Sequence, residues 1–445
     1  MEKILKLISE KKIMEAKQRL EKKNVVDIAS FLGDINKDSV VKIFRVLPKD
    51  MAADVFSYLN YEEKMHIINS ITDSEISNII DELYMDDTVD FLEELPANVV
   101  KKILKNTDED KRNIINHFLN YPDSSAGSIM TIEYTDLKKT MTIAEAISHI
   151  KKTGIDKETI NTCYVIDNNR VLLGIISLRK LILSAEDMHI EDLMKEEFIS
   201  VNTLDDQENI AHLFKKYDLL SIPVTDNEKR LVGIITIDDI VDIIDQENTE
   251  DFQKMAAMEP SEEEYLKTSV WGLAKHRILW LLVLMISATF TGNIIRRFED
   301  VLSSVVILAS FIPMLMDTGG NAGSQSSTLI IRGLALDEIK LSDGFKIIFK
   351  EFRVALITGT ILAFVNFLRV YFFEKVGFLI SLTVCISLFF TVIVAKVVGG
   401  ILPILAKKLK LDPAIMASPL ITTIVDAIAL FLYFTLSVSL LNLPV

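Results

Sequence analysis

A run of small polar residues interrupts an apolar stretch between Phe311 and Ile331 and limits what this part of the chain can fold into. The run reads Asp-Thr-Gly-Gly-Asn-Ala-Gly-Ser-Gln-Ser-Ser-Thr from residue 317 to residue 328. Its flanks are apolar enough to enter a bilayer, where no water satisfies loose backbone groups. Small polar residues at that depth are typical of close helix packing or of a water-filled cavity. The stretch therefore predicts a tight helix contact or a path for a polar solute.

Two interpretations of this run stay open. Close helix packing without any path explains the glycines as well as a path does. It explains Asn321 and Gln325 less well, because amide groups in hydrocarbon need partners. Asp317 needs a partner more urgently, since a carboxylate near a helix centre costs roughly 2.5 to 3.5 kcal/mol on insertion scales. The candidate pore-lining residues of the run are Gly319, Gly320, Asn321, Gln325 and Asp317.

Charge and hydropathy divide the 445 residues into an acidic soluble half and a membrane half. The formal net charge is −15, and most carboxylates precede about residue 270. An acidic soluble half disfavours nucleic acid as a partner and favours cations. Cys163 and Cys385 lie in different halves, which leaves no disulfide framework or thiolate metal site. The N-terminal residues lack a continuous apolar run, so they predict an amphipathic helix and not a signal peptide.

The first 120 residues have a helical pattern of short amphipathic units. Pro48, Asn60 and Pro96 stand at the turns between such units, where they would end one helix and begin the next. This predicts an all-helical repeat domain. Asp86 and Asp90 share one face of a helix there, where like charges repel unless a cation or a helix N-terminus stabilises them. On spacing alone, capping at a helix N-terminus explains these two residues better than cation binding does.

Residues 121–244 alternate strand and helix patterns, and two segments repeat each other. Residues 163–177 and 221–236 each contain two strands joined by an Asx-rich turn, and each ends in Gly-Ile-Ile-Ser or Gly-Ile-Ile-Thr. This pair resembles a tandem CBS domain. The resemblance implies a regulatory module that often binds adenine nucleotides through a Gly-x-x-Thr-x-x-Asp tail. Gly233, Thr236 and Asp239 match that tail, whereas the first repeat has Lys180 in place of the Asp, so at most one nucleotide site is expected.

An acidic helical segment at residues 245–270 leads to five candidate membrane spans, each with about the 20 apolar residues that a bilayer requires. The distribution of Lys and Arg between the spans predicts a cytosolic N-terminal half. The expected spans are residues 277–295, 301–331, 346–373, 377–405 and 413–441.

The last span contains one charged residue, Asp426. Thr422 and Thr423 lie four and three residues before it and share its helix face, so we include them among the pore-lining candidates. A carboxylate at this depth usually faces the interior of a bundle or a water-filled path. The alternative is a buried, hydrogen-bonded Asp with a structural role.

Together these features resemble the MgtE family of magnesium channels and transporters. The residues that carry the resemblance are Tyr121 to Gly127 before the CBS pair, the Gly-Gly-Asn-Ala-Gly-Ser-Gln motif from residue 319, and the segment from Asp412-Pro413 to Asp426. The resemblance implies a homodimer with five spans per subunit, a pore at the dimer interface and a cytosolic Mg²⁺ sensor. It matches Asp426 to a selectivity carboxylate. The resemblance also implies a set of carboxylates that bind Mg²⁺ in the cytosolic sensor. These are Asp86, Asp90, Asp206, Glu208, Asp218, Asp239, Asp242, Glu247, Glu250 and Asp251.

Two residues depart from the family pattern. Ser418 stands where some relatives have Asn, which leaves an amide contribution to the pore in doubt. Asp317 stands where some relatives have Gly, so the resemblance gives it no role. The expected fold is multidomain: an all-α helical-repeat domain (residues 1–120), an α/β tandem CBS domain (121–244), an acidic connecting helix (245–270) and an all-α transmembrane pore domain with five spans (271–445).

The expected function is Mg²⁺-selective transport across the plasma membrane, the inner membrane of the cell, driven by membrane potential and closed by cytosolic Mg²⁺. The expected partners are membrane lipid and a second copy of the chain, with ATP as a regulatory ligand of the CBS pair. One alternative is a carrier coupled to Na⁺ or H⁺, and another is a sensor that signals without conducting. An enzyme is disfavoured because no pair of nucleophile and base suggests itself. The residues do not decide whether the chain is a channel or a carrier. They also do not give the order of selectivity among Mg²⁺, Mn²⁺, Co²⁺ and Ni²⁺.

Overall fold

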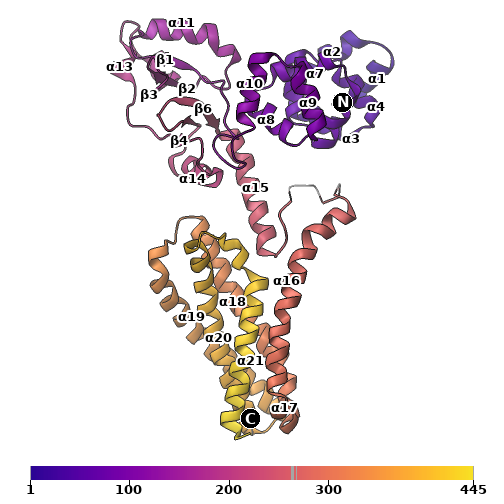
Figure 1. Cartoon of the computed structure of the whole chain (residues 1–445), viewed down its shortest axis with the longest axis vertical. Helices are drawn as coiled ribbons and strands as arrows, with labels where there is room; N and C mark the ends of the chain where they lie inside the picture. The colour runs from indigo at the N-terminus through magenta and orange to yellow at the C-terminus, as the bar shows by residue number, and fades with distance from the viewer. Residues whose placement is uncertain (1, 262–264, 267, 444–445) are drawn as a thin grey trace. The chain divides into compact units, whose positions relative to one another are not determined.

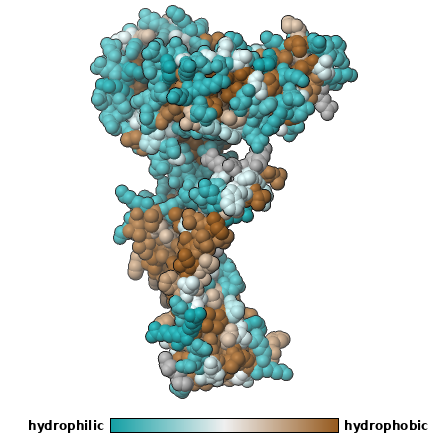
Figure 2. Space-filling model, turned by 45° about the vertical axis from the view of Figure 1, so that its right-hand side comes forward, coloured by the Kyte–Doolittle hydropathy of each residue, from teal (hydrophilic) through white to brown (hydrophobic). Residues whose placement is uncertain are grey.

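The computed structural model describes residues 2–261, 265–266 and 268–443. The chain forms two compact units, residues 1–244 and 245–445, which we call the soluble unit and the membrane unit (Figure 1). Each unit has a hydrophobic core of its own. In Figure 2 the soluble unit has a mainly hydrophilic surface, whereas the membrane unit carries broad hydrophobic areas. The expected connecting segment includes residues 262–264 and 267, which lie outside the described residues.

Ten short helices build the first part of the soluble unit, as the sequence predicts. Asn60 caps the sixth helix by accepting a hydrogen bond from the backbone nitrogen of Glu63 at 3.2 Å, and Pro48 and Pro96 precede the fifth and ninth helices. Helices α3, α5, α7 and α9 pack in succession, which gives the repeat its stacked arrangement. The helices are α1 (Glu2–Ser9), α2 (Ile13–Leu20), α3 (Val25–Asp34), α4 (Lys37–Phe44), α5 (Lys49–Ser57), α6 (Tyr61–Ser70), α7 (Asp73–Glu82), α8 (Met85–Glu93), α9 (Ala97–Asn106) and α10 (Glu109–Phe118).

Two three-stranded sheets follow, one for each repeat predicted from the sequence. In each sheet the first strand is parallel to the second, and the second and third form an antiparallel hairpin. The first repeat has β1 (Asp136–Lys138), α11 (Ile143–Thr153), the 3-10 helix η1 (Gly154–Asp156), β2 (Thr162–Ile166), β3 (Leu172–Ser177), α12 (Leu178–Leu183) and α13 (Ile190–Leu193). The second has β4 (Val201–Asn202), α14 (Gln207–Tyr217), β5 (Ser221–Thr225) and β6 (Leu231–Thr236).

Long helices dominate the rest of the chain. Helix α15 (Ile237–Met255) contains the boundary between the two units. The membrane unit continues with α16 (Val270–Arg297), α17 (Glu299–Ser304), the 3-10 helix η2 (Val306–Phe311), α18 (Ile312–Ala335), the 3-10 helix η3 (Leu341–Asp343), α19 (Gly344–Leu368), the π-helix η4 (Arg369–Phe373), α20 (Phe378–Lys408), the 3-10 helix η5 (Pro413–Met416) and α21 (Ser418–Leu441).

Four helical segments of the described chain are long and apolar enough to cross a membrane, so the expected count of five is not confirmed. The expected span at residues 301–331 differs most, because α17 and η2 occupy its beginning and the long helix α18 starts at Ile312. The polar run lowers the hydropathy of α18 although its 24 residues could span a bilayer. The four segments are Val270–Arg297, Leu341–Phe373, Phe378–Lys408 and Pro413–Leu441.

Helix α18 packs against α20 and α21 through its glycines. A methyl group on Gly319 would lie 2.8 Å from Thr391 Cγ2, and one on Gly320 would lie 2.8 Å from Thr422 Cγ2. The closest approach is between backbones, since a methyl group on Gly399 of α20 would overlap the carbonyl oxygen of Gly323. Glycine is therefore required at this crossing for the two helices to touch.

We expect Gly399→Ala to lower the stability of the membrane unit. The added methyl group meets backbone, which cannot move aside as a side chain can, and overpacking of this kind costs about 1 to 3 kcal/mol. The thermal unfolding midpoint of the purified chain should fall. Gly292→Ala in α16 is the matched control, since nothing lies within 4 Å of its added methyl group. Equal midpoints for the two variants would contradict the close helix crossing.

Candidate functional site

Asp426 lies in the middle of α21, half-buried among the helices of the membrane unit. Its Oδ1 atom is buried and has no hydrogen-bond partner among the described residues. Thr423 does not supply one, because its hydroxyl donates to the carbonyl oxygen of Pro419 at 3.0 Å. Asp317 of α18 is near enough to act electrostatically on Asp426. A buried carboxylate oxygen without a donor favours a cation or water as its partner.

The polar run of α18 has two different faces. Gly319, Gly320 and Gly323 are buried against neighbouring helices, which agrees with the packing interpretation of the glycines. Asn321 and Gln325 are exposed and, with the exposed Asp317 one turn before them, form a polar stripe along the helix. The exposed polar stripe is compatible with a path for a polar solute along α18. The buried glycines pack the helix against its neighbours.

Predicted sensor residues meet in the soluble unit at an acidic cluster around Asp86. Asp86 of α8 is only 8% exposed, and the charges of Asp239 and Asp87 add to burial in raising the pKa of Asp86 well above its ordinary value. Burial, with help from neighbouring carboxylates, also raises the pKa of Asp87 and of Asp239 to about 6 each and that of Glu158 to about 8. The Oε2 atom of Glu158 is buried and has no hydrogen-bond partner among the described residues. This cluster holds its negative charges at a cost that a bound cation would relieve.

The remaining sensor candidates of the soluble unit lie on surfaces. Asp206 accepts hydrogen bonds from the backbone nitrogens of Glu208 and Asn209 at 3.0 and 3.4 Å and caps α14. Asp218 ends the same helix in the left-handed conformation, with a φ of 50°. Their positions are therefore accounted for by helix capping. Also exposed are the side chains of Glu208 and Asp242. Asp90 has an exposed surface as well, but its carboxyl group belongs with the cluster around Asp86, because burial and the charges of Asp87 and Asp239 raise the pKa of Asp90 to about 7.

A second acidic cluster, in the membrane unit, surrounds Lys254. Lys254 Nζ lies 2.7 Å from Asp412 Oδ2 and also forms an ion pair with Glu250. Burial lowers the pKa of Lys254, but hydrogen bonds to Asp412 and Glu250 outweigh this and raise it. Burial and the charges of Asp412, Glu247 and Glu250 raise the pKa of Asp251 to about 6. Lys254 is thus a cation of the chain itself among the predicted sensor carboxylates.

The nucleotide-binding tail predicted in the second CBS repeat is locally assembled. The Thr236 hydroxyl lies 2.5 Å from Asp238 Oδ1 and 2.8 Å from Asp239 Oδ2, so two carboxylates compete for its one proton. A methyl group on Gly233 would lie 2.7 Å from the carbonyl oxygen of Thr131. Close backbone packing therefore accounts for Gly233. In the first repeat the exposed Lys180 donates a hydrogen bond from Nζ to the carbonyl oxygen of Leu193 at 2.6 Å, so a bonded ammonium stands where the second repeat has a carboxylate. The difference between the repeats supports at most one nucleotide site, next to a carboxylate that could accept hydrogen bonds from ribose hydroxyls.

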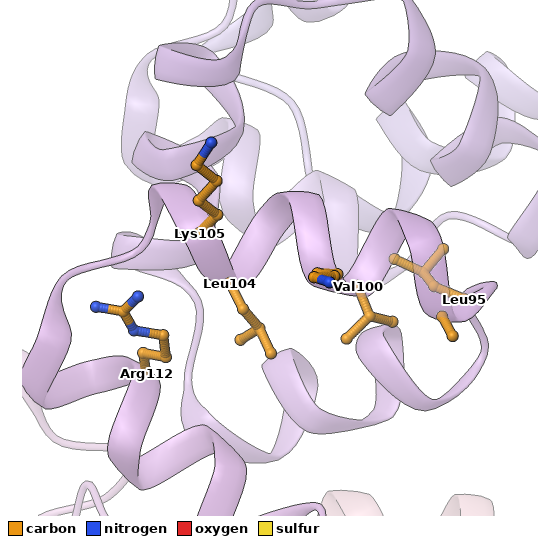
Figure 3. A pocket seen from close by; sticks show the side chains of 7 residues that line it. Leu95, Val100, Leu104, Lys105 and Arg112 are labelled. Carbon is orange, nitrogen blue, oxygen red and sulfur yellow. The ribbon is translucent and has the colours of Figure 1, made fainter.

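Throughout the described residues, no three His, Cys, Asp or Glu side chains are arranged as ready metal ligands. The acidic clusters are thus groups of like charge and not preformed cages. A hollow of about 580 Å³ lies beside α9. The side chains that line it are apolar or basic, and it is therefore unsuited to a cation (Figure 3). Its lining residues are Leu95, Ala97, Val100, Lys101, Leu104, Lys105 and Arg112.

Similarity to known proteins covers nearly the whole chain. The family model of the MgtE intracellular N domain matches residues 23–124, the CBS domain matches residues 126–187 and 190–246, and the MgtE divalent cation transporter matches residues 312–436. The magnesium transporter MgtE of Bacillus subtilis is 32% identical over 99% of this chain and 97% of that protein. The chain belongs to the MgtE family of magnesium transporters. MgtE of Thermus thermophilus is 33% identical over 95% of this chain and 94% of its own length.

Two solved structures resemble this MgtE family member in its soluble part. The soluble part of a magnesium transporter is 30% identical with a TM-score of 0.53, and covers 55% of this chain and 96% of that chain. The cytosolic domain of the Mg²⁺ channel MgtE in complex with ATP is 30% identical with a TM-score of 0.51, and covers 55% of this chain and 100% of that chain. The family and the apolar helices establish a membrane protein with a soluble N-terminal region, of a transporter family and not an enzyme family.

Several polar residues of these sites were missed from the sequence. Glu158 belongs to no motif of the sequence, and only the fold brings it near Asp86 and Asp239. The ion pair between Lys254 and Glu250 could have been predicted, because the two residues lie four positions apart on one helix face. Asp412 was noted as part of a family motif and not as an acceptor for Lys254. The side chain of Ser418, where an Asn was in question, lies outside the described residues.

The acidic cluster around Asp86 predicts that the chain loses stability as pH rises. The pKa values in the fold exceed the ordinary values near 4, so the folded state binds more protons and stability falls as pH rises towards 8. Thermal unfolding of the purified chain in EDTA should show this loss. Glu158→Gln should reduce it, whereas the exposed Glu191→Gln, as control, should not. Identical pH profiles for the two variants would exclude Glu158 from the cluster.

Proposed function

We propose that this chain is a Mg²⁺-selective channel that works as a homodimer in the cell (inner) membrane. The observation that carries the proposal is the buried Oδ1 atom of Asp426, which has no hydrogen-bond partner among the described residues of the membrane unit. Two copies of Asp426 brought together by a two-fold axis would match the double charge of the ion. Relatives named magnesium transporters over nearly the full length support this choice of ion.

The exposed polar stripe of α18 supports a second copy of the chain. Asp317, Asn321 and Gln325 would be costly against lipid tails, so they require protein or water in front of them. A pore at a dimer interface meets this need. Mg²⁺ gives up its water reluctantly, and a hydrated ion would therefore contact carboxylate and amide oxygens through its own water shell.

We include α18 as a fifth membrane-crossing segment beside the four apolar ones. At 1.5 Å per residue its 24 residues extend about 36 Å, enough for a hydrocarbon core of about 30 Å. Five crossings place the two ends of the chain on opposite sides, with the soluble unit in the cytosol. The inside-negative potential then contributes about 4.6 kcal/mol per divalent ion at 100 mV, so uptake needs no ATP hydrolysis.

Closure would follow from Mg²⁺ binding to the two acidic clusters. A site that exists only in the closed form contributes about 1.4 kcal/mol at ten times its dissociation constant. A change in the ratio of closed to open channels from 1:99 to 99:1 requires about 5.5 kcal/mol, and hence about four such sites. Helix α15 carries members of both clusters, Asp239 in its first turn and Glu247, Glu250 and Asp251 near its end. Binding at either cluster therefore acts on one helix.

ATP is proposed as a regulatory ligand of the second CBS repeat. Thr236 and Asp239 would hold the ribose, and the bound nucleotide would add phosphate oxygens as further cation ligands. The relative's cytosolic domain in complex with ATP supports this assignment. Because Asp239 also belongs to the acidic cluster around Asp86, nucleotide and cation would influence each other there.

A Na⁺- or H⁺-coupled carrier is the second candidate. Two carboxylates that interact within the membrane unit, Asp317 and Asp426, are the observation that favours it, because such groups can relay a coupling ion. Mg²⁺ flux that depends on a Na⁺ or proton gradient in proteoliposomes would support the carrier. Unitary currents that persist without either gradient would support the channel.

Asp426→Ala should abolish Mg²⁺ flux into proteoliposomes, because the only carboxylate of α21 is lost. Asp426→Asn should retain little flux, since an amide offers an oxygen but no charge. Asp337→Ala in the turn after α18 is the control and should conduct normally. Full flux and selectivity in Asp426→Ala would refute the pore assignment.

Joint replacement of Asp239, Asp242, Glu247, Glu250 and Asp251 by their amides should free the flux from inhibition by Mg²⁺ on the side of the soluble unit. The concentration of Mg²⁺ that halves the current should rise at least tenfold, since about two sites at 1.4 kcal/mol each are removed. Patch recording from proteoliposomes gives this value directly. The control replaces the exposed Glu186, Asp187, Glu191, Glu196 and Glu197 of the first repeat in the same way. Unchanged inhibition in the first variant would disprove the sensor.

A further inference from the structure

A buried carboxylate in the membrane unit has no part in the sites described above. Glu351 lies in the third turn of α19 and is only 8% exposed, inside the apolar segment Leu341–Phe373. The sequence places it between Lys350 and Arg353, where it resembles one more charge at the membrane surface. Buried carboxylates are rare in such segments and need a specific partner.

The partner of Glu351 belongs to the polar run of α18. Ser326 donates a hydrogen bond to Glu351 Oε2 at 2.6 Å, and Ser326 is only 1% exposed. A buried donor and a buried acceptor that pair in this way leave neither group without a partner. Ser326 directly follows Gln325, a member of the exposed polar stripe.

Helix α20 packs against the stem of Glu351. A methyl group on Gly400 would lie 3.3 Å from Glu351 Cγ, so the absence of a side chain there leaves room for the Glu351 stem. Lys396, one turn before Gly400 on the same face of α20, is buried at 6% exposure. The hydrogen bond from Ser326 holds the carboxylate beside this helix.

A second hydroxyl fastens α18 on the same buried side. Ser327 donates to the carbonyl oxygen of Met416, just before α21, at 2.6 Å. Successive residues of a helix differ by about 100° in direction, so two bonds from neighbouring serines to two different helical segments define the rotation of α18 about its axis. This rotation determines where Asp317, Asn321 and Gln325 point.

We propose that Glu351 is a positioning residue for ion passage, which fixes the rotation of α18 through Ser326 and so holds the polar stripe in register with Asp426. This inference rests on the proposed Mg²⁺ conduction. Glu351 itself acts as a hydrogen-bond acceptor and does not contact the ion. An acceptor of the same shape should replace it, whereas an apolar side chain should not.

The test compares Glu351→Gln, Glu351→Leu and Ser326→Ala in proteoliposomes, with Glu338→Leu as control. Glu338 is exposed in the turn between α18 and α19. Glu351→Gln keeps an acceptor and should conduct within about twofold of the unmodified chain. Glu351→Leu and Ser326→Ala should lose about tenfold in Mg²⁺ flux, the factor expected when a buried polar group loses its hydrogen-bond partner, and should change the ratio of Mg²⁺ to Co²⁺ flux. A merely structural defect would lower both fluxes equally.

A second readout does not depend on conduction. Gln325→Cys in a Cys163→Ala, Cys385→Ala background reports the orientation of α18 through its reaction rate with a water-soluble maleimide. Both native cysteines are buried, so their replacement removes background labelling. Adding Glu351→Leu should change the rate, whereas adding Glu351→Gln should not.

The two readouts separate the two hypotheses. An unmodified chain without Mg²⁺ flux would overturn the proposed function, while the labelling rates would still test the role of Glu351 in positioning α18. A conducting unmodified chain, with flux ratio and labelling rate both unchanged by Glu351→Leu, would overturn the positioning role alone. Equal defects in Glu351→Gln and Glu351→Leu would also overturn it, because charge and not the acceptor would then matter.

Discussion

Hydrocarbon offers no water to polar groups, and this constraint governs the helix that carries the polar run. On the buried side of its polar run, α18 approaches its neighbours through glycines and through two bonded hydroxyls, with Ser326 bonded to Glu351 and Ser327 bonded to the carbonyl oxygen of Met416. The other side presents Asp317, Asn321 and Gln325 without cover. A polar helix can thus be held firmly in an apolar bundle and still offer polar atoms to a path.

In the soluble unit the fold brings carboxylates together, and their mutual repulsion makes this arrangement unfavourable. Asp86, Glu158 and Asp239 come together from three separate parts of the chain, and burial adds to their mutual repulsion. The described residues offer them no preformed metal cage, so a cation would have to draw them together. An assembly that is unfavourable without a cation and favourable with it is what a sensor requires, because its conformation then depends on concentration.

Local patterns in the sequence were enough for the helical repeat, the two β-hairpins of the CBS pair and the isolated Asp426, since each depends on neighbouring residues. Contacts between distant residues were not predictable in this way. Glu158 lies near Asp86 although 71 positions separate them in the sequence, and no periodicity links the two residues. Glu351 was missed because its neighbours Lys350 and Arg353 have the composition of a membrane flank. The hydropathy of α18 is lowered by the very residues that make it a candidate path, which explains why four spans are found and five were expected.

The two acidic clusters differ in one physical respect that bears on gating. Lys254 already neutralises part of the charge of Glu250 and Asp412, whereas the cluster around Asp86 is dominated by burial and by like charges. A divalent ion that enters the cluster around Lys254 must displace a tethered ammonium, and its net gain is reduced by the ion pairs it breaks. At the cluster around Asp86 the ion relieves repulsion directly. Under the proposed mechanism the cluster around Asp86 therefore fills at lower Mg²⁺ concentration, and the cluster around Lys254 responds later.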